Sequence, residues 1–337
     1  MPGPTSPYAS VIVPAYNAAA TLAACLDALA CQTIPAEDYE VIVVDDGSSD
    51  ETTVVARRGG AAQILVCPHR GPAETRNAGA AAARGEVLVF TDADCEPQPD
   101  WLAEMLSPLA DRAIAGVKGA YTTRQTAVVP RLAQCEFEER YARLSARPYI
   151  DFFDTYSAAL RTAAFGAAGG FDPAFPYPNN EDVDLAYRLA GLGFKMVFAP
   201  RARVCHRHAA SWPIYLRLKF RRGYWRMIVY RLHPAKALAD SYTPQLLKLQ
   251  VGLVYGAVLA AALGLLGGRG LAAAGLAAAA AIAALLISAL PFTRLATRRD
   301  PGVARWAPFF ILARAAAFAA GVAGGAIGML TFRPRRS

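Results

Sequence analysis

The chain has 337 residues, a formal net charge of +8 and 54% hydrophobic residues, and its mean hydropathy is positive. The apolar residues gather near the C-terminal end, where 251–268, 270–293 and 315–332 contain no charged side chain. Each run is close to or above the length that crosses about 30 Å of hydrocarbon. This pattern argues against a purely soluble protein and predicts a soluble part of roughly 240 residues followed by a membrane region.

The positive charge, the N-terminal residues and the cysteines predict the binding partner and the cellular compartment of the soluble part. Much of the charge lies at 201–236 and 294–336, beside the apolar runs, so anionic lipid is the expected partner and nucleic acid is not. Met1 to Ser10 contains no basic region followed by an apolar core, which predicts no signal peptide and a cytoplasmic soluble part. Six cysteines without C-x-x-C spacing predict reduced, mostly buried thiols and disfavour a zinc site.

The soluble part alternates short β-rich runs with helical patterns. This alternation predicts an α/β fold with a mainly parallel sheet and helices on both faces. Strands are expected at 10–15, 39–44, 63–67, 86–90 and 114–121, with a strand region at 149–160 and last strands at 194–199 and 203–206. Helices are expected at 21–32, 73–83, 101–109, 131–147 and 181–190.

The C-terminal third is expected to be helical. Residues 213–232 are rich in Arg, Lys and aromatics on a helical period, which predicts a basic amphipathic helix in a membrane interface. The predicted organisation is therefore a soluble domain at 1–210, interfacial helices at 211–245 and two or three membrane helices at 246–332. Small-residue spacings such as Gly252-x3-Gly256, Gly321-x3-Gly325 and Gly324-x3-Gly328 allow close helix packing, but they are weak evidence in so Ala- and Gly-rich a segment.

The expected membrane topology follows from the arginines. If the soluble domain is inside, the first run exits, the second returns, and Arg294, Arg298, Arg299 and Arg305 fall in the cytoplasm, as the positive-inside rule prefers. A third crossing would place the last arginines, Arg333, Arg335 and Arg336, outside. The last segment therefore either crosses against the rule, re-enters or lies in the membrane plane, and Arg314 near its start could snorkel.

Asp92-Ala93-Asp94 is the most informative motif of the soluble part. It follows the apolar run 86–91, and alternate side chains of a strand point to the same side. Two carboxylates at the end of a buried strand suit a hard divalent cation that holds a diphosphate. Alone, however, such a motif is more often an exposed turn.

Other polar residues are expected at the same edge of the sheet. Pro14, Ala15, Tyr16 and Asn17 follow the first strand, and Asp45-Asp46-Gly47-Ser48 follows the second. Doubly wound folds bind ligands at this edge, where a carboxylate can accept a hydrogen bond from a base or a ribose. Ser48 is better explained as a turn residue. The usual dinucleotide and P-loop glycine patterns are absent from these positions.

A third acidic cluster starts a predicted helix. Gly169-Gly170-Phe171-Asp172 precedes Asn180-Glu181-Asp182. Acids at a helix start often only compensate the helix dipole. Held over a metal-bound diphosphate, such a carboxylate could instead take a proton from an attacking hydroxyl.

Taken together, six motifs resemble glycosyltransferase family 2 and its GT-A fold over about residues 8–210. In chain order they are VIVPAYN, VVDDGSSD, TRNAG, FTDADC, GGFD and NEDVDLAYR. The resemblance implies inverting single displacement from a nucleotide-sugar donor, by default a UDP-sugar, with Mg²⁺ or Mn²⁺ supporting the departing diphosphate. It implies a base contact by Asp46, nucleotide support by Arg76, metal ligation by Asp94 and general-base catalysis by Asp182. Asp92 would serve ribose or metal. The expected donor-binding residues are Pro14, Tyr16, Asn17, Asp46, Arg76, Asp92, Ala93 and Asp94.

The segment after the predicted sheet adds further candidates. His206 best matches a histidine that the family often uses as a metal ligand, although His206 and His208 could equally be a pair of interfacial basic residues. Residues 220–226 are similar to a segment of succinoglycan-type exopolysaccharide transferases and depart from the Q-x-x-R-W motif of processive synthases. Glu181, Arg222 and Trp225 are the candidates for acceptor contacts or support of the site.

Three functions are compatible with these residues. The first is transfer of one sugar to a polyprenyl-linked glycan at the cytoplasmic face of the plasma membrane. The second is a polyprenyl-phosphate sugar synthase, in which the acceptor is the phosphate itself. The third is an inactive transferase-like scaffold, against which the presence of Asp92, Asp94 and Asp182 argues.

Overall fold

The structure is a computed structural model that describes residues 7–175, 180–265, 271–330 and 332. Its contacts divide the chain into two compact units. The first unit comprises Met1–Arg124 and Arg143–Arg207, with the last five residues, and the second comprises Gln125–Ala142 and His208–Phe332. Residues 125–142 thus group with the C-terminal helices, which a single boundary near residue 210 does not foresee.

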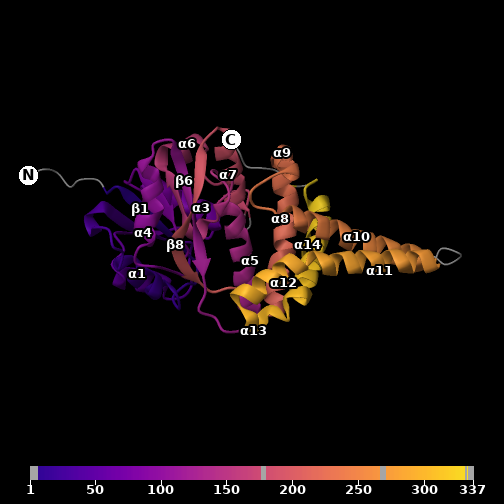
Figure 1. Cartoon of the computed structure of the whole chain (residues 1–337). Helices are drawn as coiled ribbons and strands as arrows, with labels where there is room; N and C mark the ends of the chain where they lie inside the picture. The colour runs from indigo at the N-terminus through magenta and orange to yellow at the C-terminus, as the bar shows by residue number, and fades with distance from the viewer. Residues whose placement is uncertain (1–6, 176–179, 266–270, 331, 333–337) are drawn as a thin grey trace, which may run out of the picture. The chain divides into compact units, whose positions relative to one another are not determined.

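Within the described residues, the first unit is built on an eight-stranded sheet with the order β3-β2-β1-β4-β7-β6-β8-β5. Strands β1, β6 and β8 of this sheet are labelled in Figure 1. The strands are β1 Ala9–Ala15, β2 Tyr39–Asp45, β3 Gln63–Val66, β4 Val87–Phe90, β5 Cys95–Pro97, β6 Ile114–Thr122, β7 Ala158–Arg161 and β8 Lys195–His206. Strands β1 to β4 pair in parallel, as do β6 and β8, whereas β7 and β5 pair antiparallel with their neighbours. The mainly parallel α/β sheet expected from the sequence is therefore confirmed.

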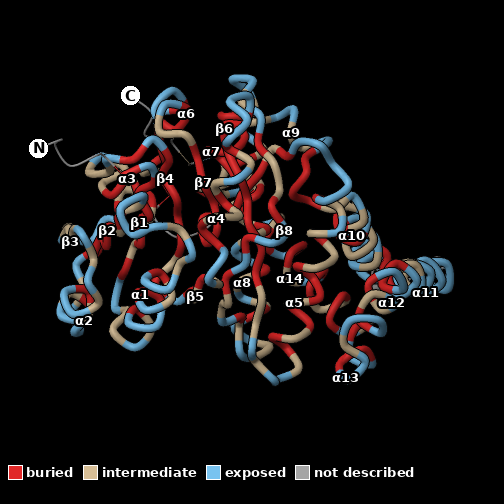
Figure 2. Tube along the Cα trace, turned by 60° about the vertical axis from the view of Figure 1, so that its left-hand side comes forward, coloured by how far each residue is buried: buried red, intermediate tan, exposed pale blue. Residues whose placement is uncertain are grey.

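Helices cover this sheet and leave its carboxyl edge open to the loops. The helices of the first unit are α1 Leu22–Ala30, α2 Thr52–Arg58, α3 Pro72–Ala82, α4 Trp101–Leu106, α6 Thr162–Ala167 and α7 Glu181–Gly191. Helix α3 packs on β1 and β2, and α4 packs on β8. Strands β1, β2, β4, β6 and β7 are buried along most of their length, whereas β3 and β8 are less buried (Figure 2). Near-continuous apolar runs such as 41–44 form the centre of this core because both faces of a parallel sheet are covered.

Several details differ from the expected elements. Of the strand region expected at 149–160, only the end forms a regular strand, in β7 Ala158–Arg161, and helix α6 Thr162–Ala167 was not expected. The last strand is one element, β8, rather than two, and its pairing with β6 is interrupted by two irregularities. The three-residue strand β5 was not expected, since so short a run carries no periodic signal. It pairs antiparallel with β8 and sets Cys95 directly opposite His206.

The second unit is helical. It contains most of α5 Val128–Ser145, followed by α8 Trp212–Leu232, α9 Pro234–Leu238, α10 Gln245–Leu265, α11 Leu271–Ser288, α12 Leu290–Arg299, α13 Pro301–Ala304 and α14 Ala307–Gly328. Gln245–Gly264, Leu271–Arg299 and Ala307–Gly328 are long and apolar enough to cross a membrane. Much of α11 is exposed although its side chains are apolar, as Figure 2 shows. An exposed apolar surface of this extent is typical of a membrane or protein contact.

Within this unit α8 and α14 are in close contact through glycine. A Cβ added at Gly321 or Gly325 would strike the backbone of α8 at Phe220 or Tyr224, whereas Gly252 and Gly256 of α10 have nothing within 4 Å. The Gly321-x3-Gly325 spacing therefore marks a true helix contact, and the Gly252-x3-Gly256 spacing does not mark one within the described residues. The difference shows why the spacing alone was weak evidence.

A buried polar cluster joins the helices of the second unit. The Glu136 carboxylate accepts hydrogen bonds from Lys219 Nζ at 2.7 Å and Tyr215 Oη at 2.9 Å. Arg314 lies 3.6 Å from the same carboxylate and donates to Gln250 Oε1 at 3.0 Å. Arg314 thus lies inside a helix that begins at residue 307, not near the start of a run at 315, and it is buried by partners. Lys219 of α8 is likewise buried, so the basic residues of 213–232 do not form one solvated face.

Candidate active site

A cavity of about 620 Å³ opens at the carboxyl edge of β1, β2 and β4. Its lining includes every residue that the sequence nominates for the donor: Pro14, Tyr16, Asn17, Asp46, Arg76, Asp92, Ala93 and Asp94. Parallel strands end at the same edge, so loops far apart in the chain meet there. The cavity has the size of a small-molecule site.

One wall of the cavity is aromatic and acidic. The ring of Tyr16 stacks on that of His69 with centroids 4.2 Å apart, and half of Tyr16 is exposed. The Asp46 carboxylate accepts hydrogen bonds from the backbone N–H groups of Arg70 at 2.9 Å and Gly71 at 3.0 Å, and it lies 3.0 Å from His69 Nδ1. Asp46 therefore holds the 69–71 loop in place. Together these groups present a flat ring and a buried carboxylate edge to a ligand.

Asn17 and Ser48 hold the two neighbouring loops together. The backbone N–H of Asn17 donates to Ser48 Oγ at 2.8 Å, and Asn17 Oδ1 accepts from the backbone N–H of Ser49 at 2.9 Å. Asn17 has a φ of 48°, a left-handed conformation that Asn tolerates better than most residues. Ser48 N–H in turn donates to Asp45 Oδ1 at 2.9 Å, so Ser48 acts in a turn, as the sequence suggests.

Arg76 of α3 connects the Asp92-Ala93-Asp94 motif to the start of α7. Its guanidinium is buried and donates to Asp92 Oδ1 at 2.8 Å and to Glu181 Oε1 at 2.9 Å. Burial alone would lower the pKa of Arg76, but the two carboxylates raise it above its ordinary value. Arg76 therefore stays charged and fixes both acids. This role is additional to the nucleotide support that the sequence suggests for it.

The remaining motif residues explain how α3 and α7 are placed. Asn77 exchanges two hydrogen bonds with the backbone of Phe171, at 2.8 and 2.9 Å. Arg188 of α7 donates to the carbonyl oxygens of Ala168 and Gly170 and pairs with Asp184. The turn at 169–170 needs glycine because both residues have positive φ. The GGFD and NEDVDLAYR segments are thus one structural element.

Asp182 is the second residue of α7 and is half-buried. Its carboxylate accepts a hydrogen bond from the backbone N–H of Val183 at 2.8 Å. Burial raises the pKa of Asp182 well above its ordinary value, and the charges of Glu181 and Asp154 raise it further. A carboxylate with a raised pKa is a stronger proton acceptor, which is what a general base requires.

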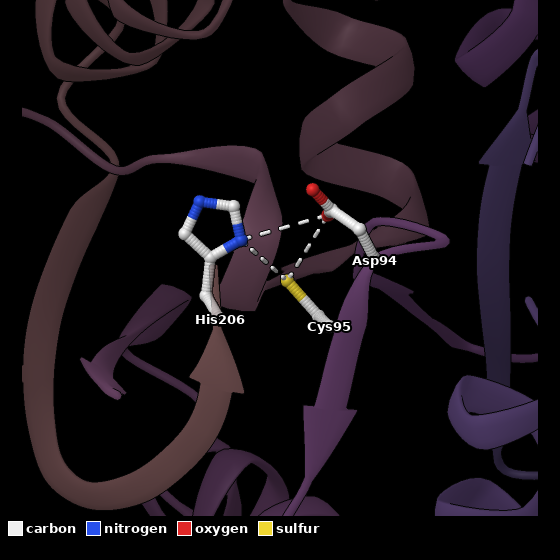
Figure 3. A group of neighbouring side chains, drawn as sticks. All are labelled: Asp94, Cys95 and His206. Carbon is white, nitrogen blue, oxygen red and sulfur yellow. Dashed lines mark hydrogen bonds and ion pairs between the residues drawn. The ribbon is translucent and has the colours of Figure 1, made fainter. Parts of the chain in front are cut away.

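Asp94 faces a second group of side chains (Figure 3). Its Oδ1 lies 3.6 Å from His206 Nδ1 and 3.8 Å from Cys95 Sγ, and Cys95 Sγ lies 3.8 Å from His206 Nδ1. Burial would raise the pKa of Asp94, but the interaction with His206 lowers it below its ordinary value. The ring of His206 stacks on Tyr121 with centroids 4.4 Å apart, which fixes its plane. The two acids of the motif thus have different partners, Arg76 for Asp92 and His206 for Asp94.

The chain is similar to characterised proteins over most of its length. The sequence profile of glycosyl transferase family 2 matches residues 10–167. The glycosyltransferase AglE of Haloferax volcanii is 30% identical over 241 residues, which cover 68% of this chain and 76% of AglE. The chain belongs to glycosyl transferase family 2.

Two further relatives of this family 2 member were found. The pre-mycofactocin glycosyltransferase of Mycobacterium tuberculosis is 26% identical over 215 residues, 61% of this chain but only 44% of that protein. The mannosyltransferase PcManGT of Pyrobaculum calidifontis, solved with GDP-Man and Mn²⁺, has a TM-score of 0.62 and 25% identity. That match covers 96% of this chain and 89% of PcManGT, so it includes the helical second unit. The GT-A fold is therefore confirmed.

The family 2 fold implies a divalent cation, and the residues present suit one. Asp94, Cys95 and His206 each offer one ligand atom, and these atoms lie within 4.8 Å of one another. Carboxylate oxygen and imidazole nitrogen are donors that divalent transition metals accept. Asp92 already pairs with Arg76, so Asp94 and His206 are the better placed ligands. Of the two histidines considered from the sequence, His208 instead bonds Gln134 at 2.9 Å and stacks on Phe137.

Two residues at the site of this glycosyltransferase were not predicted from the sequence, and the roles of two others stay predictions. His69 was not foreseen, although its place in the loop after β3, at the same sheet edge, could have suggested it. Cys95 was not foreseen because its relation to His206 arises only from the β5–β8 pairing. Arg222 and Trp225 lie on α8 of the second unit, and their role toward an acceptor stays a prediction.

Proposed function

We propose that this chain transfers one sugar from a nucleoside diphosphate sugar to a polyprenyl-linked glycan at the membrane surface, with inversion at the anomeric carbon. The observation that carries the proposal is the Asp92–Arg76–Glu181 connection, which ties the acidic motif of the donor cavity to α7, the helix that begins with Glu181 and Asp182. In the described part of the chain, three helices are long and apolar enough to cross a membrane, which supports a lipid-linked acceptor. The soluble residues are assigned to the cytoplasmic side by the positive-inside rule.

The proposed roles follow from the position of each group. The Tyr16 ring and Asp46 would receive the base, and Arg76 and Asp92 the ribose and diphosphate end. Asp94 and His206 would hold Mg²⁺ or Mn²⁺, which supplies positive charge to the diphosphate when bound. Asp182 would accept the proton of the acceptor hydroxyl while the oxygen of that hydroxyl bonds to the anomeric carbon. The bond to the donor phosphate breaks in the same step, and the diphosphate leaves with the electron pair.

The donor is tested first, with the full chain in detergent and Mn²⁺ or Mg²⁺ present. Because a ligand that binds only the folded state stabilises it, the correct donor at 100 times its Kd should add about 2.7 kcal/mol to the free energy of unfolding. A UDP-sugar is expected to give the largest shift. PcManGT was solved with GDP-Man, so GDP-sugars form the comparison series. Stabilisation by a GDP-sugar alone would overturn the UDP assignment and leave the reaction class intact.

The acceptor is tested with the donor so identified. Incubation with a polyprenyl-diphosphate-linked sugar should give a product longer by one sugar, with the inverted anomeric configuration by NMR. Release of a monosaccharyl polyprenyl phosphate from polyprenyl phosphate would instead establish the synthase. Donor binding with no transfer to either acceptor would favour the scaffold.

A further inference from the structure

We propose that Cys95 is a third protein ligand of the cation site, which gives this site a preference for borderline-soft cations such as Zn²⁺ and Co²⁺ over Mg²⁺. The inference rests on the proposed metal site of Asp94 and His206 and extends it by one ligand. The cysteine spacings argued against a zinc site because they contain no local pair. Strand pairing, however, can bring together ligands that are distant in the sequence.

Strand pairing places Cys95 and His206 on one side of the sheet, and a turn brings Asp94 to them. Cys95 of β5 is the register partner of His206 of β8, and directly opposed residues of an antiparallel pair point to the same face. Asp94 precedes β5 in a turn closed by a hydrogen bond from the Cys95 N–H to the Asp92 carbonyl oxygen. The turn frees Asp94 from the alternation of the strand. Figure 3 shows the carboxylate, thiol and imidazole directed toward one another.

The separation of His206 and Asp94 fits a cation between the two groups better than a direct hydrogen bond. The 3.6 Å between His206 Nδ1 and Asp94 Oδ1 exceeds the usual 2.7–3.2 Å of an N–H···O bond. Ligand atoms of a tetrahedral zinc site with ordinary bond lengths lie about 3.4–3.6 Å apart. Ligand atoms on neighbouring corners of a magnesium octahedron lie about 3.0 Å apart. The observed 3.6, 3.8 and 3.8 Å are closer to the tetrahedral values.

The chemical types of the three ligand atoms also favour zinc over magnesium. One sulfur, one nitrogen and one oxygen form a ligand set typical of zinc, whereas magnesium takes oxygen. Cys95 is buried and Tyr121 fixes the imidazole plane, so two of the three donors are held rigidly. On binding, the thiol gives up its proton to solvent and the sulfur coordinates as a thiolate. Three protein ligands would leave further positions for substrate oxygen.

The test is Co²⁺ binding to the full chain in detergent, without donor or acceptor. The wild type should show the near-ultraviolet charge-transfer band of a thiolate bound to Co²⁺. Cys95→Ala should abolish this band. Cys25→Ala is the matched control, because Cys25 is also buried and lies 3.6 Å from the Asp92 carbonyl oxygen but outside the ligand group. A wild-type Co²⁺ complex without the band, or an unchanged band in Cys95→Ala, overturns the inference.

Affinity gives a second, independent measurement. By chelator competition, Cys95→Ala should weaken Zn²⁺ binding by more than about 100-fold, the upper end of what loss of an outer-shell partner costs, and leave Mg²⁺ binding unchanged. Equal Zn²⁺ affinity in both proteins contradicts the proposal. If Cys95→Ala fails to fold, the wild-type spectrum decides alone. Sugar transfer with Mg²⁺ or Mn²⁺ is measured separately, so a missing band with retained transfer rejects the cysteine ligand and not the proposed function.

Discussion

Arg76 shows how one buried side chain organises this site. Its two ion pairs place the carboxylates of Asp92 and Glu181 on either side of one guanidinium. The pair with Asp92 reduces the negative charge next to Asp94. The pair with Glu181 fixes the first turn of α7, and with it Asp182, relative to the donor cavity. The acids of the site therefore have separate tasks although they are close in space.

Asp182→Asn should lower the rate of sugar transfer by about 10² to 10⁴, because a general base contributes that much and an amide cannot accept the proton. Donor-induced thermal stabilisation should be retained. The measurements are initial rates and thermal shifts of the full chain. Asp27→Asn, the same change at an exposed position of α1, is the control and should keep full activity. Full transfer by Asp182→Asn would exclude this base.

The pH dependence of transfer should carry the signature of Asp182. Burial and the charges of Glu181 and Asp154 raise its pKa, while Arg76 opposes them. The base acts only when deprotonated, so kcat/KM should fall as pH decreases through this raised pKa. The acid limb should therefore lie above the ordinary aspartate range near pH 3.9. An acid limb within the ordinary aspartate range would contradict the assignment.

Arg76→Met should destabilise the first unit by about 3–5 kcal/mol, because it leaves two carboxylates in a buried site without their cation. Arg70→Met is the control: Arg70 is 63% exposed and its pair with Glu74 is worth less than about 1 kcal/mol. Thermal unfolding measures both. Adding Glu181→Gln to Arg76→Met should restore part of the stability. A neutral Arg76→Met would mean that the carboxylates find other compensation.

At the scale of elements, short and discontinuous pieces complete the site. Strand β5 has only three residues, yet its pairing with β8 brings His206 next to Asp94. Helix α7 gains its position from the glycine turn at 169–170 and from Arg188, which bonds the carbonyls of that turn. The long regular elements form the frame, whereas these pieces set the position of the reactive groups.

The contact between α14 and α8 predicts a difference between two glycines. Gly325→Ala should destabilise the second unit by about 1–3 kcal/mol, since its methyl group would overlap the backbone of α8 at Tyr224. Gly256→Ala should be neutral or slightly stabilising, because nothing lies within 4 Å and Ala favours the helix. Thermal unfolding in detergent compares the two. Equal effects would contradict the observed helix contact.

At the scale of the whole molecule, two units of different surface character belong to one chain. The first is an α/β unit with the donor cavity at one edge of its sheet, and the second presents helices with exposed apolar faces. Residues 128–142 of α5 lie in the second unit, where Val129, Leu132 and Ala133 are part of its core. Cutting the chain near residue 210 would expose these side chains.

The full chain should remain in the membrane pellet after an alkaline carbonate wash, because three helices within the described residues are long and apolar enough to be embedded. A chain ending at Arg207 should lack that anchorage and aggregate through the exposed face of α5. Immunoblots of pellet and supernatant measure both. Release of the full chain by carbonate would mean that its helices do not span the membrane.

The sequence by itself determined the elements and the chemical inventory. Apolar periodicity predicts β1 to β4, α3 and α7, and the motif order predicts the family, because both signals are local in the chain. Every nominated donor residue lines one cavity, since parallel strands deliver their loops to one edge. The roles of these residues stay predictions.

Only the tertiary structure decided which groups meet. Arg76 bonds Glu181 across 105 positions of sequence, and Cys95 lies beside His206 across 111. The choice of His206 over His208 follows from β8 ending between them, so that one ring stacks on Tyr121 and the other on Phe137. Local residue patterns encode helices and strands, but contacts between distant residues depend on how those elements pair and pack. That is why the Arg76–Glu181 ion pair and the place of Cys95 beside His206 became visible only in the folded chain, whereas Asp94 and His206 were metal candidates from the sequence.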